Sequence, residues 1–240
     1  MPPQVAFVTG AAGGIGRATV ASLRARGLRI YAGDVALAAI PCGDPDFFTA
    51  QLDVTSEGAV NDAVAEALRV FGRIDHVVHL AGRAGAGPLR NVSLADWHSI
   101  MDVNLTSAFL LARACHSALQ ASRGTLTLMS STNGLNGGTA LSGPAYAVAK
   151  AGIVNLTRYL AREWASDGIR VNCLAPGPIE TPMVTGRFDT ATIEKLQRSV
   201  PLNRLGQPDD IAHAIDYLTG PRAGFVTGTV MNLSGGMVLD

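Results

Sequence analysis

The sequence predicts a doubly wound α/β fold, with a seven-stranded parallel sheet and helices on both of its faces. Three observations support this prediction. Short apolar runs alternate along the chain with longer segments of helical periodicity. Most of these runs are solidly apolar or β-branched, which is typical of strands buried on both faces. No linker, repeat or low-complexity tract interrupts the 240 residues. We therefore expect a single Rossmann-type domain over residues 1–240.

The apolar runs define the expected strands, and right-handed crossovers predict the strand order 3-2-1-4-5-6-7. The strands are expected at residues 5–8, 28–32, 47–52, 76–80, 125–129, 170–174 and 229–233.

The segments between these runs are expected to be helical. The helices are predicted at residues 15–26, 57–71, 94–120 (as two helices), 145–165 and 208–218. Ser56 and Ser93 stand where N-caps belong, with acidic residues in the turns that follow. C-caps are expected at Gly27, Gly72 and Gly168. A shortened helix at 36–40 follows the second strand and ends before Pro41.

The composition excludes several functional classes. The chain has 19 basic and 19 acidic residues, so no overall positive charge attracts nucleic acid or an anionic membrane. The three cysteines lie far apart, which argues against a disulfide framework or a structural zinc site. No run of 18 apolar residues and no signal peptide is visible, so we expect a cytoplasmic protein without a bound metal. Of the basic residues, only Lys150 and Lys195 are lysines.

A glycine-rich loop follows the first strand and contains Gly10, Gly14, Ile15 and Gly16. Glycines permit a tight turn and a close backbone approach to a pyrophosphate, and a helix N-terminus offers free N–H groups. Such a loop alone is equally consistent with a structural turn. Here an acid, Asp34, closes the second strand, where a carboxylate can accept hydrogen bonds from the adenosine ribose. Together the two features predict a dinucleotide site.

Asp34 also predicts which dinucleotide is bound. Its carboxylate would repel a 2′-phosphate, and Gly13 and Val35 occupy the positions where a basic residue could bind one. We therefore expect NAD rather than NADP. The alternative is that Asp34 only caps the short helix after it.

Tyr146 and Lys150 stand four residues apart, on one face of the helix that Pro144 begins. An ammonium group beside a phenol favours the phenolate, so we expect Lys150 to lower the pKa of Tyr146. The alternative is an aromatic residue and a lysine on an ordinary helix surface. The choice of lysine in a chain that otherwise uses arginine favours the first interpretation.

The glycine loop and the Tyr-x-x-x-Lys pair together resemble the short-chain dehydrogenase/reductase family, and the resemblance extends from Thr9 to Gly236. It implies an adenine contact at Asp53 and Val54, an adenosine ribose contact at Ala81 and Gly82, and a catalytic asparagine at Asn104. It also implies contacts to the nicotinamide amide in the segment that contains Pro176, Gly177, Ile179 and Thr181. Lys150 would then hold the nicotinamide ribose hydroxyls, and Tyr146 would contact both the cofactor and the substrate.

Two departures from the family pattern stand out. The family's usual Asn-Asn-Ala-Gly is His79-Leu80-Ala81-Gly82 here. His79 could replace the hydrogen bonds that anchor the strand, or it could be a neutral core histidine, which we favour.

The second departure is that the best candidate for the catalytic serine, Ser131, stands 15 residues before Tyr146. The family spacing is about two residues shorter and would select Asn133. Ser130 and Ser142 are weaker alternatives. We expect the loop 135–143 to be lengthened and to line the substrate pocket.

The resemblance implies reversible hydride transfer between a secondary alcohol and a ketone. Tyr146 would act as acid/base, Ser131 would bind the substrate oxygen, and Asn104 would hold a water that connects Lys150 to solvent. A mostly apolar lid at 183–200 favours a hydrophobic or alicyclic small-molecule substrate. A 3-oxoacyl-thioester reductase using NADPH and a catalytically silent NAD-binding regulator remain as alternatives. Two helical stretches, 103–120 and 145–165, are too apolar to be covered by the sheet alone. The resemblance implies that they pair with those of another copy, in a homodimer or homotetramer.

Overall fold

The computed structural model describes residues 3–36 and 44–239, and within them forms a parallel sheet of seven strands. The strands run in the order β3-β2-β1-β4-β5-β6-β7, which confirms the order predicted from the sequence. Their bounds are β1 Val5–Thr9, β2 Arg29–Asp34, β3 Phe47–Gln51, β4 His76–His79, β5 Thr125–Met129, β6 Arg170–Pro176 and β7 Val230–Leu233.

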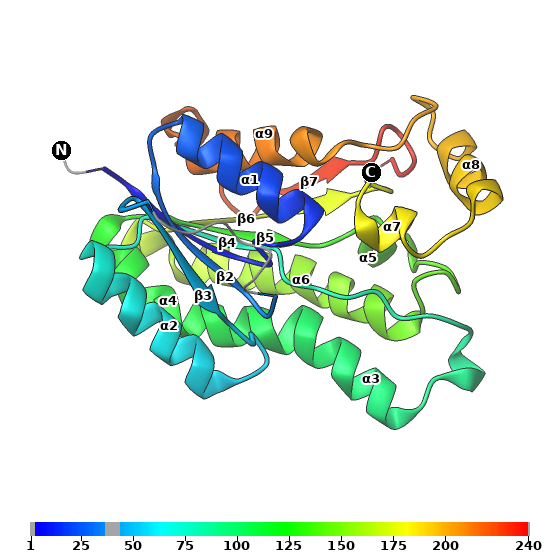
Figure 1. Ribbon diagram of the computed structural model, residues 1–240, viewed down its shortest axis with the longest axis horizontal. Helices are drawn as coiled ribbons and strands as arrows, with labels where there is room; N and C mark the ends of the chain where they lie inside the picture. Colours follow the sequence, from blue (N-terminus) through cyan, green and yellow to red (C-terminus); the bar gives the residue numbers. More distant parts are fainter. Residues whose placement is uncertain (1–2, 37–43, 240) are drawn as a thin grey trace.

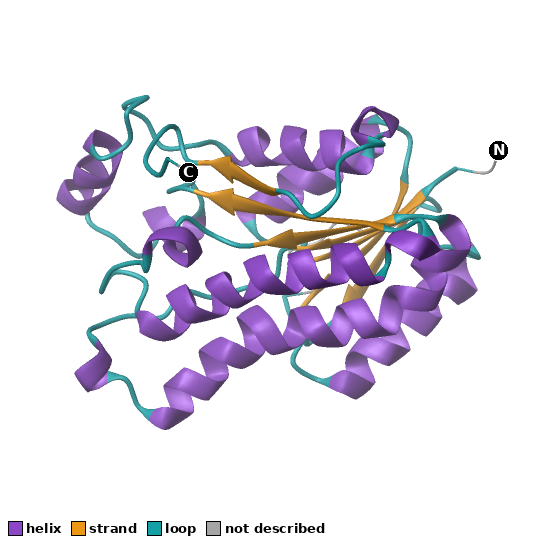
Figure 2. Cartoon of the chain, turned by 180° about the vertical axis from the view of Figure 1, so that it is seen from behind, coloured by secondary structure: helices purple, strands orange, loops and turns teal. Residues whose placement is uncertain are grey.

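Helices cover both faces of this sheet (Figures 1 and 2). Helices α1 and α9 lie on one face, and α2, α4 and α6 lie on the other (Figure 1). The α-helices are α1 Gly14–Ala25, α2 Glu57–Phe71, α3 Leu94–Met101, α4 Ser107–Ser122, α5 Asn133–Asn136, α6 Pro144–Glu163, α7 Pro182–Thr185, α8 Thr190–Arg198 and α9 Pro208–Thr219. The short helix expected at 36–40 lies, beyond Ala36, outside the described residues.

The central strand β1 shows why the strands read as continuous apolar runs. Val5 and Phe7 belong to the hydrophobic core under α2, α4 and α6, whereas Ala6 and Val8 belong to the core under α1 and α9. All four side chains are fully buried. Because side chains alternate along a strand, a sheet covered on both faces needs an apolar residue at every position.

The predicted helix boundaries follow from local hydrogen bonds. The Ser56 hydroxyl accepts from the Ala59 amide at 3.3 Å, and the Ser93 hydroxyl accepts from the Asp96 amide at 3.0 Å. The three predicted C-cap glycines have left-handed backbones, with φ of 87° at Gly27, 76° at Gly72 and 76° at Gly168. Gly168 ends a short 3₁₀ turn, η4 (Ala165–Asp167), because α6 itself stops at Glu163.

The segment predicted as two helices forms α3 and α4, which confirms that prediction. A π turn, η3 (Asp102–Thr106), joins the two helices into one continuous run from 94 to 122. At this turn the Ser107 amide donates to the Asp102 carbonyl, five residues back. The Val103 carbonyl instead accepts from the Ser107 hydroxyl at 2.8 Å. The side chain therefore replaces the backbone donor that the π turn has diverted.

His79, at the end of β4, is both a neutral core residue and a strand anchor. It pairs in register with Thr9 of β1, and it is 2% exposed. Since the Ser107 hydroxyl already donates to a carbonyl, its oxygen accepts from His79 Nε2 at 2.9 Å. Nδ1 of His79 then accepts from the Thr9 hydroxyl at 2.7 Å. The two interpretations left open by the sequence are therefore both correct.

Burial lowers the pKa of His79 to about 3, and the positive charge of Lys150 acts in the same direction. Below the ordinary histidine pKa of about 6.5, the unfolded chain binds a proton that folded His79 does not. The free energy of unfolding should therefore fall as the pH falls from about 6.5 towards 3.

In a His79→Asn variant this contribution is absent. The slope of unfolding free energy against pH should become shallower, by up to about 1.4 kcal/mol per pH unit. Urea unfolding curves recorded between pH 7 and pH 4.5 measure the slope, with His98→Asn, at an exposed position, as the matched control. Equal slopes for the wild-type protein and His79→Asn would contradict the assignment. Buried His76, whose pKa burial lowers to about 4, should keep part of the slope in both proteins.

Candidate active site

A cavity of about 250 Å³ lies beyond the carboxyl ends of the strands, where doubly wound sheets bind their ligands. Asn104, Ser131, Tyr146 and Lys150 all line this cavity. They come from η3, from the segment after β5 and from α6, so the fold brings together residues that are up to 46 positions apart.

The glycine loop after β1 is packed too tightly for side chains. A Cβ atom at Gly10 would lie 2.6 Å from the Ala81 amide nitrogen, and φ is +68° there. A Cβ atom at Gly16 would lie 2.1 Å from the Gly10 carbonyl oxygen. Because these glycines lack a Cβ atom, the loop, the first turn of α1 and the segment after β4 can pack backbone to backbone.

The first turn of α1 is open to an anionic ligand. Its N-cap residue, Gly13, provides no side-chain cap, and no acidic residue lies in the turn. Ile15 and Thr181 both line the cavity, and a Cβ atom at Gly14 would lie 2.8 Å from Thr181 Cγ2. This uncapped helix N-terminus beside the predicted nicotinamide segment fits the pyrophosphate of a dinucleotide.

Asp34 lies at the end of β2, facing the glycine loop. Its Oδ2 accepts from the Ala12 amide at 3.0 Å, and its Oδ1 accepts from the Ala36 amide at 2.9 Å. Asp53 lies after the neighbouring strand β3 and accepts from the amide and the hydroxyl of Thr55, at 2.9 and 2.7 Å. Val54 beside it is buried. The two carboxylates are thus held on adjacent strand ends.

Lys150 is buried beneath the cavity, with 3% of its surface exposed. Its Nζ donates to the Met129 carbonyl at 2.8 Å and lies 5.5 Å from the centroid of the Tyr146 ring. Burial lowers the pKa of Lys150 to about 8, because the charged form loses its hydration. The Met129 contact could not be predicted from residue types, because a backbone carbonyl makes it.

Tyr146 differs from the expectation in one respect. Burial raises the pKa of its phenol above the ordinary value, and a hydrogen bond with Ser131 acts against this rise. The expectation that Lys150 lowers the pKa of Tyr146 is therefore wrong for the protein alone. The physical reason is that desolvation of the phenolate outweighs the neighbouring polar groups.

Asn104 is held rigidly at the π turn and is 1% exposed. Its amide nitrogen donates to the carbonyls of Arg83 and Ile100, at 2.8 and 2.9 Å. A Cβ atom at Gly82 would lie 2.8 Å from Asn104 Oδ1 and 3.4 Å from Lys150 Nζ. Only a glycine leaves this space between the asparagine and the lysine free.

Ser131 is the serine that the structure places beside Tyr146. Its Oγ accepts from the Asn133 amide at 3.2 Å, which leaves the hydroxyl proton for another acceptor. The alternative Ser130 instead donates to the Lys150 carbonyl at 2.7 Å. Ser142 donates to the Thr139 carbonyl at 3.2 Å.

The segment after β5 packs backbone to backbone against α6 at Gly134. A Cβ atom there would lie 2.5 Å from the Lys150 carbonyl carbon. The loop 135–143 contributes Asn136, Thr139, Leu141 and Ser142 to the cavity wall.

The segment 183–200, expected as a lid, forms the short helices α7 and α8 at the side of the molecule (Figure 1). It contributes Met183, Val184, Arg187, Phe188 and Leu196 to the cavity wall. Met237, from the segment after β7, completes the apolar surface and was not singled out from the sequence.

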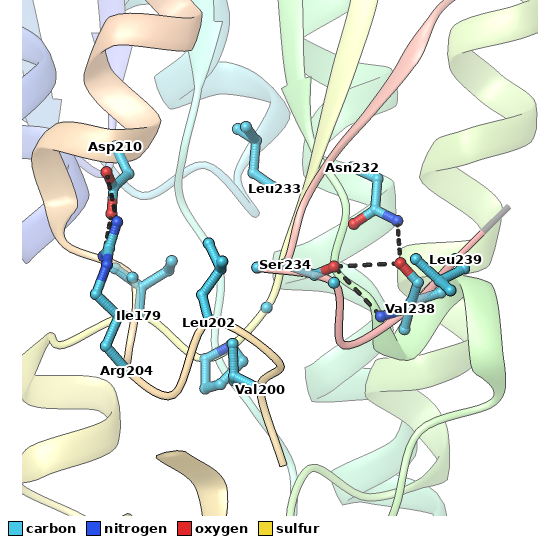
Figure 3. A pocket seen from close by; sticks show the side chains of 15 residues that line it. Ile179, Val200, Leu202, Arg204, Asp210, Asn232, Leu233, Ser234, Val238 and Leu239 are labelled. Atoms are coloured by element: carbon cyan, nitrogen blue, oxygen red, sulfur yellow. Dashed lines mark hydrogen bonds and ion pairs between the residues drawn. The ribbon is translucent and has the colours of Figure 1, made fainter. Parts of the chain in front are cut away.

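A second cavity, of about 450 Å³, lies at the carboxyl end of β7 (Figure 3). It shares the segment 177–179 with the first cavity but contains none of the four predicted catalytic residues. Its polar groups are mostly paired: Arg204 with Asp210 at 2.7 Å, and Asn232 with the Val238 carbonyl at 2.7 Å (Figure 3). We therefore place the candidate active site in the smaller cavity.

Among the described residues, no group of three or more His, Cys, Asp or Glu side chains could hold a metal ion. None of the helices that the structure describes has the length and apolar character needed to cross a membrane.

A parallel sheet of this strand order, with a glycine turn at the start of its first helix, is the architecture of the Rossmann-type oxidoreductases that use nicotinamide cofactors. The chain belongs to the short-chain dehydrogenase/reductase family. A family model described as enoyl-(acyl carrier protein) reductase matches residues 10–238.

Similar proteins support this membership. A 3-oxoacyl-[acyl-carrier-protein] reductase of Synechocystis sp. is 35% identical over 98% of this chain and 97% of its own length. A cis-4-hydroxycyclohexanecarboxylate dehydrogenase of Sinomonas cyclohexanicum is 36% identical over 97% of this chain and 96% of its own length. The crystal structure of a short-chain dehydrogenase/reductase (glucose/ribitol dehydrogenase) from Brucella melitensis superimposes with a TM-score of 0.93 at 31% identity. That superposition covers 100% of this chain and 98% of the other.

The packing of the glycine loop can be tested with Gly16→Ala. The new methyl group would overlap the Gly10 carbonyl, so the loop must shift. We expect a lower melting temperature and at least a tenfold weaker affinity for NADH, measured by thermal unfolding and fluorescence titration. Gly58→Ala is the control, because a Cβ atom there meets nothing within 4 Å. An unchanged melting temperature and affinity for Gly16→Ala would show that the loop tolerates the displacement.

Proposed function

We propose that the protein is an NAD(H)-dependent oxidoreductase that interconverts a secondary alcohol and a ketone. The observation that carries this proposal is that Tyr146, Ser131 and Lys150 line one cavity beside an uncapped helix N-terminus. A phenol and a serine hydroxyl that line one cavity, together with a buried ammonium group, form an arrangement suited to acid/base chemistry at a substrate oxygen.

The protein's own residues would handle the substrate oxygen and its proton. In the direction of reduction, Tyr146 donates its phenolic proton to the carbonyl oxygen, and its raised pKa keeps that proton in place beforehand. The Ser131 hydroxyl donates a hydrogen bond to the same oxygen and fixes its position. When bound, the nicotinamide supplies or accepts the hydride.

Lys150 and Asn104 would support this step from below. Lys150 is held by the Met129 carbonyl, which orients its Nζ towards the space left free at Gly82. The Lys150 pKa of about 8 allows the group to exchange a proton near neutral pH. Asn104 Oδ1 lies at the same space, where it could hold the water that connects Lys150 to solvent.

The cofactor would extend from the glycine loop to the segment after β6. Asp34 supports NAD over NADP, because its carboxylate faces the loop, bound to the Ala12 amide. We assign cofactor contacts to Gly10, Gly14, Ile15, Gly16, Asp34, Asp53, Val54, Ala81, Gly82, Tyr146, Lys150, Pro176, Gly177, Ile179 and Thr181.

The substrate has two candidate classes, and both undergo the same reduction at a ketone. The apolar wall formed by Leu141, Met183, Phe188 and Met237 supports a small hydrophobic or alicyclic ketone. The name of the Synechocystis relative supports a 3-oxoacyl thioester instead, which we pair with NADPH as cofactor.

We also propose that the protein assembles as a homodimer or homotetramer in the cytoplasm. Large side chains on α4 and α6 face solvent, with exposed fractions of 47% for Phe109, 48% for Val148 and 64% for Tyr159. Pairing of these helices with those of a second copy would cover them. Within the described residues, Cys115 and Cys173 are free thiols, which suits a reducing compartment.

The role of Tyr146 can be tested with Tyr146→Phe. Loss of the acidic proton should reduce kcat at least a hundredfold, while the affinity for NADH stays within about threefold. Stopped-flow turnover on a panel of ketones, with fluorescence titration of NADH, measures both. Tyr159→Phe, at an exposed position on the same helix, is the control. Turnover within tenfold of wild type in Tyr146→Phe would exclude the assignment. NADH binding without any turnover by the wild-type protein would instead favour the silent regulator.

The cofactor preference can be tested through Asp34. Wild-type kcat/KM should be higher with NADH than with NADPH, because the carboxylate repels a 2′-phosphate. Asp34→Ser should lower the NADH-to-NADPH ratio at least tenfold by removing that charge. Steady-state kinetics with both cofactors give the ratio. A wild-type preference for NADPH would overturn the proposal of NAD and support the thioester reductase.

A further inference from the structure

We propose that Arg187 binds a carboxylate of the substrate, so that the protein acts on a hydroxy acid or keto acid rather than on a neutral alcohol or ketone. This inference rests on the proposed function and specifies its substrate class. Arg187 lies between α7 and α8 and lines the same cavity as Tyr146 and Ser131.

Arg187 is held in place by the backbone on the far side of the cavity. Its Nη2 donates to the Leu141 carbonyl at 2.8 Å and also to the Gly85 carbonyl. These acceptors belong to the segment after β4 and to the loop 135–143, so the guanidinium joins three separate parts of the cavity rim. An arginine held in this way loses little conformational entropy when it binds a ligand.

The charge of Arg187 is left uncompensated by these bonds. Carbonyl groups accept hydrogen bonds but do not neutralise a cation, and no described carboxylate forms an ion pair with Arg187. Asp189, two residues further on, is engaged in capping α8, where its Oδ1 accepts from the Thr192 amide at 2.8 Å. With Nη2 committed to the two carbonyls, Nη1 and Nε of Arg187 remain to donate to a ligand.

The described residues of the cavity wall carry positive charge and no negative charge. Among the described residues that line it, none is Asp or Glu, and the two charged residues are Lys150 and Arg187. Lys150 is already committed beneath Tyr146. An anionic group in the cavity would therefore meet one available cation and no competing acid.

A carboxylate can bind the donors that remain on this arginine. With both Nη2 hydrogens engaged, it would accept a single hydrogen bond from Nη1 or Nε, and such a charge-assisted bond is about twice as strong as a neutral one. The apolar residues around Arg187, including Phe188 and Leu141, would enclose the hydrocarbon part of the acid.

The kinetic test compares 4-oxocyclohexanecarboxylate with its neutral counterpart, 4-oxocyclohexanecarboxamide. Wild-type kcat/KM should favour the acid. In Arg187→Gln, the ratio of kcat/KM for acid over amide should fall about 10- to 100-fold, mainly through KM for the acid. Arg187→Lys, which keeps the charge but cannot bind the two carbonyls and a ligand with separate nitrogen atoms, should fall in between. The control is Arg198→Gln, because Arg198 lies on α8 outside the cavity wall and bonds to Glu194.

A binding test separates this inference from the proposed function. Cyclohexanecarboxylate and cyclohexanecarboxamide, which cannot be reduced as ketones, are titrated calorimetrically into the NADH complex. The acid should bind the wild-type protein at least tenfold more tightly than the amide, and Arg187→Gln should remove the difference. This result would support the role of Arg187 even if no ketone in the panel were reduced, which would count against the proposed function alone.

Either of two results would overturn the inference. One is equal affinity of the wild-type protein for acid and amide. The other is an acid-to-amide ratio that falls as much in Arg198→Gln as in Arg187→Gln, because the effect would then be general charge and not a specific contact.

Discussion

The burial of the Lys150 ammonium is the constraint on which the rest of the site depends. A cation with 3% of its surface exposed must keep its hydrogen bonds, and the Met129 carbonyl provides one of them. Gly82 packs against Nζ and leaves room for Asn104 beside it, and neighbouring His79 is kept neutral partly by the same charge. The end of β5, the segment after β4 and helix α6 are therefore mutually fixed around one charged atom.

The sequence predicted the features that depend on local pattern. Solid apolar runs predicted all seven strands, because both faces of the sheet are covered, and helix-capping residues such as Ser56 predicted where helices begin. Contacts made by backbone atoms could not be predicted in this way. The π turn at Asn104 and the Met129 carbonyl bond to Lys150 leave no signature in the residue types. The pKa of Tyr146 was predicted wrongly, since desolvation depends on how closely distant segments pack over the phenol.

The cavity combines a protonated phenol with a positively biased rim. The raised pKa of Tyr146 keeps its phenol protonated, while Arg187 at the rim carries a charge that no described side chain neutralises. The acid/base group and the proposed anion-binding group come from different elements, α6 and the segment between α7 and α8. The chemistry and the choice of substrate can therefore change independently in sequence. This separation is consistent with relatives of similar identity whose names include a 3-oxoacyl reductase and a hydroxycyclohexanecarboxylate dehydrogenase.

The π turn η3 amounts to one extra residue in an otherwise regular helix. Each residue of an α-helix advances the chain by about 100° around the axis. Deleting one residue from 102–106 would straighten the hydrogen-bond ladder, yet it would rotate all of α3 by that angle relative to α4. Asn104 would then lose the Ile100 carbonyl that orients it, while Ser107 would keep its place beside His79. The π turn thus sets the rotation of α3 and Asn104 about the helix axis relative to α4, which packs on the sheet.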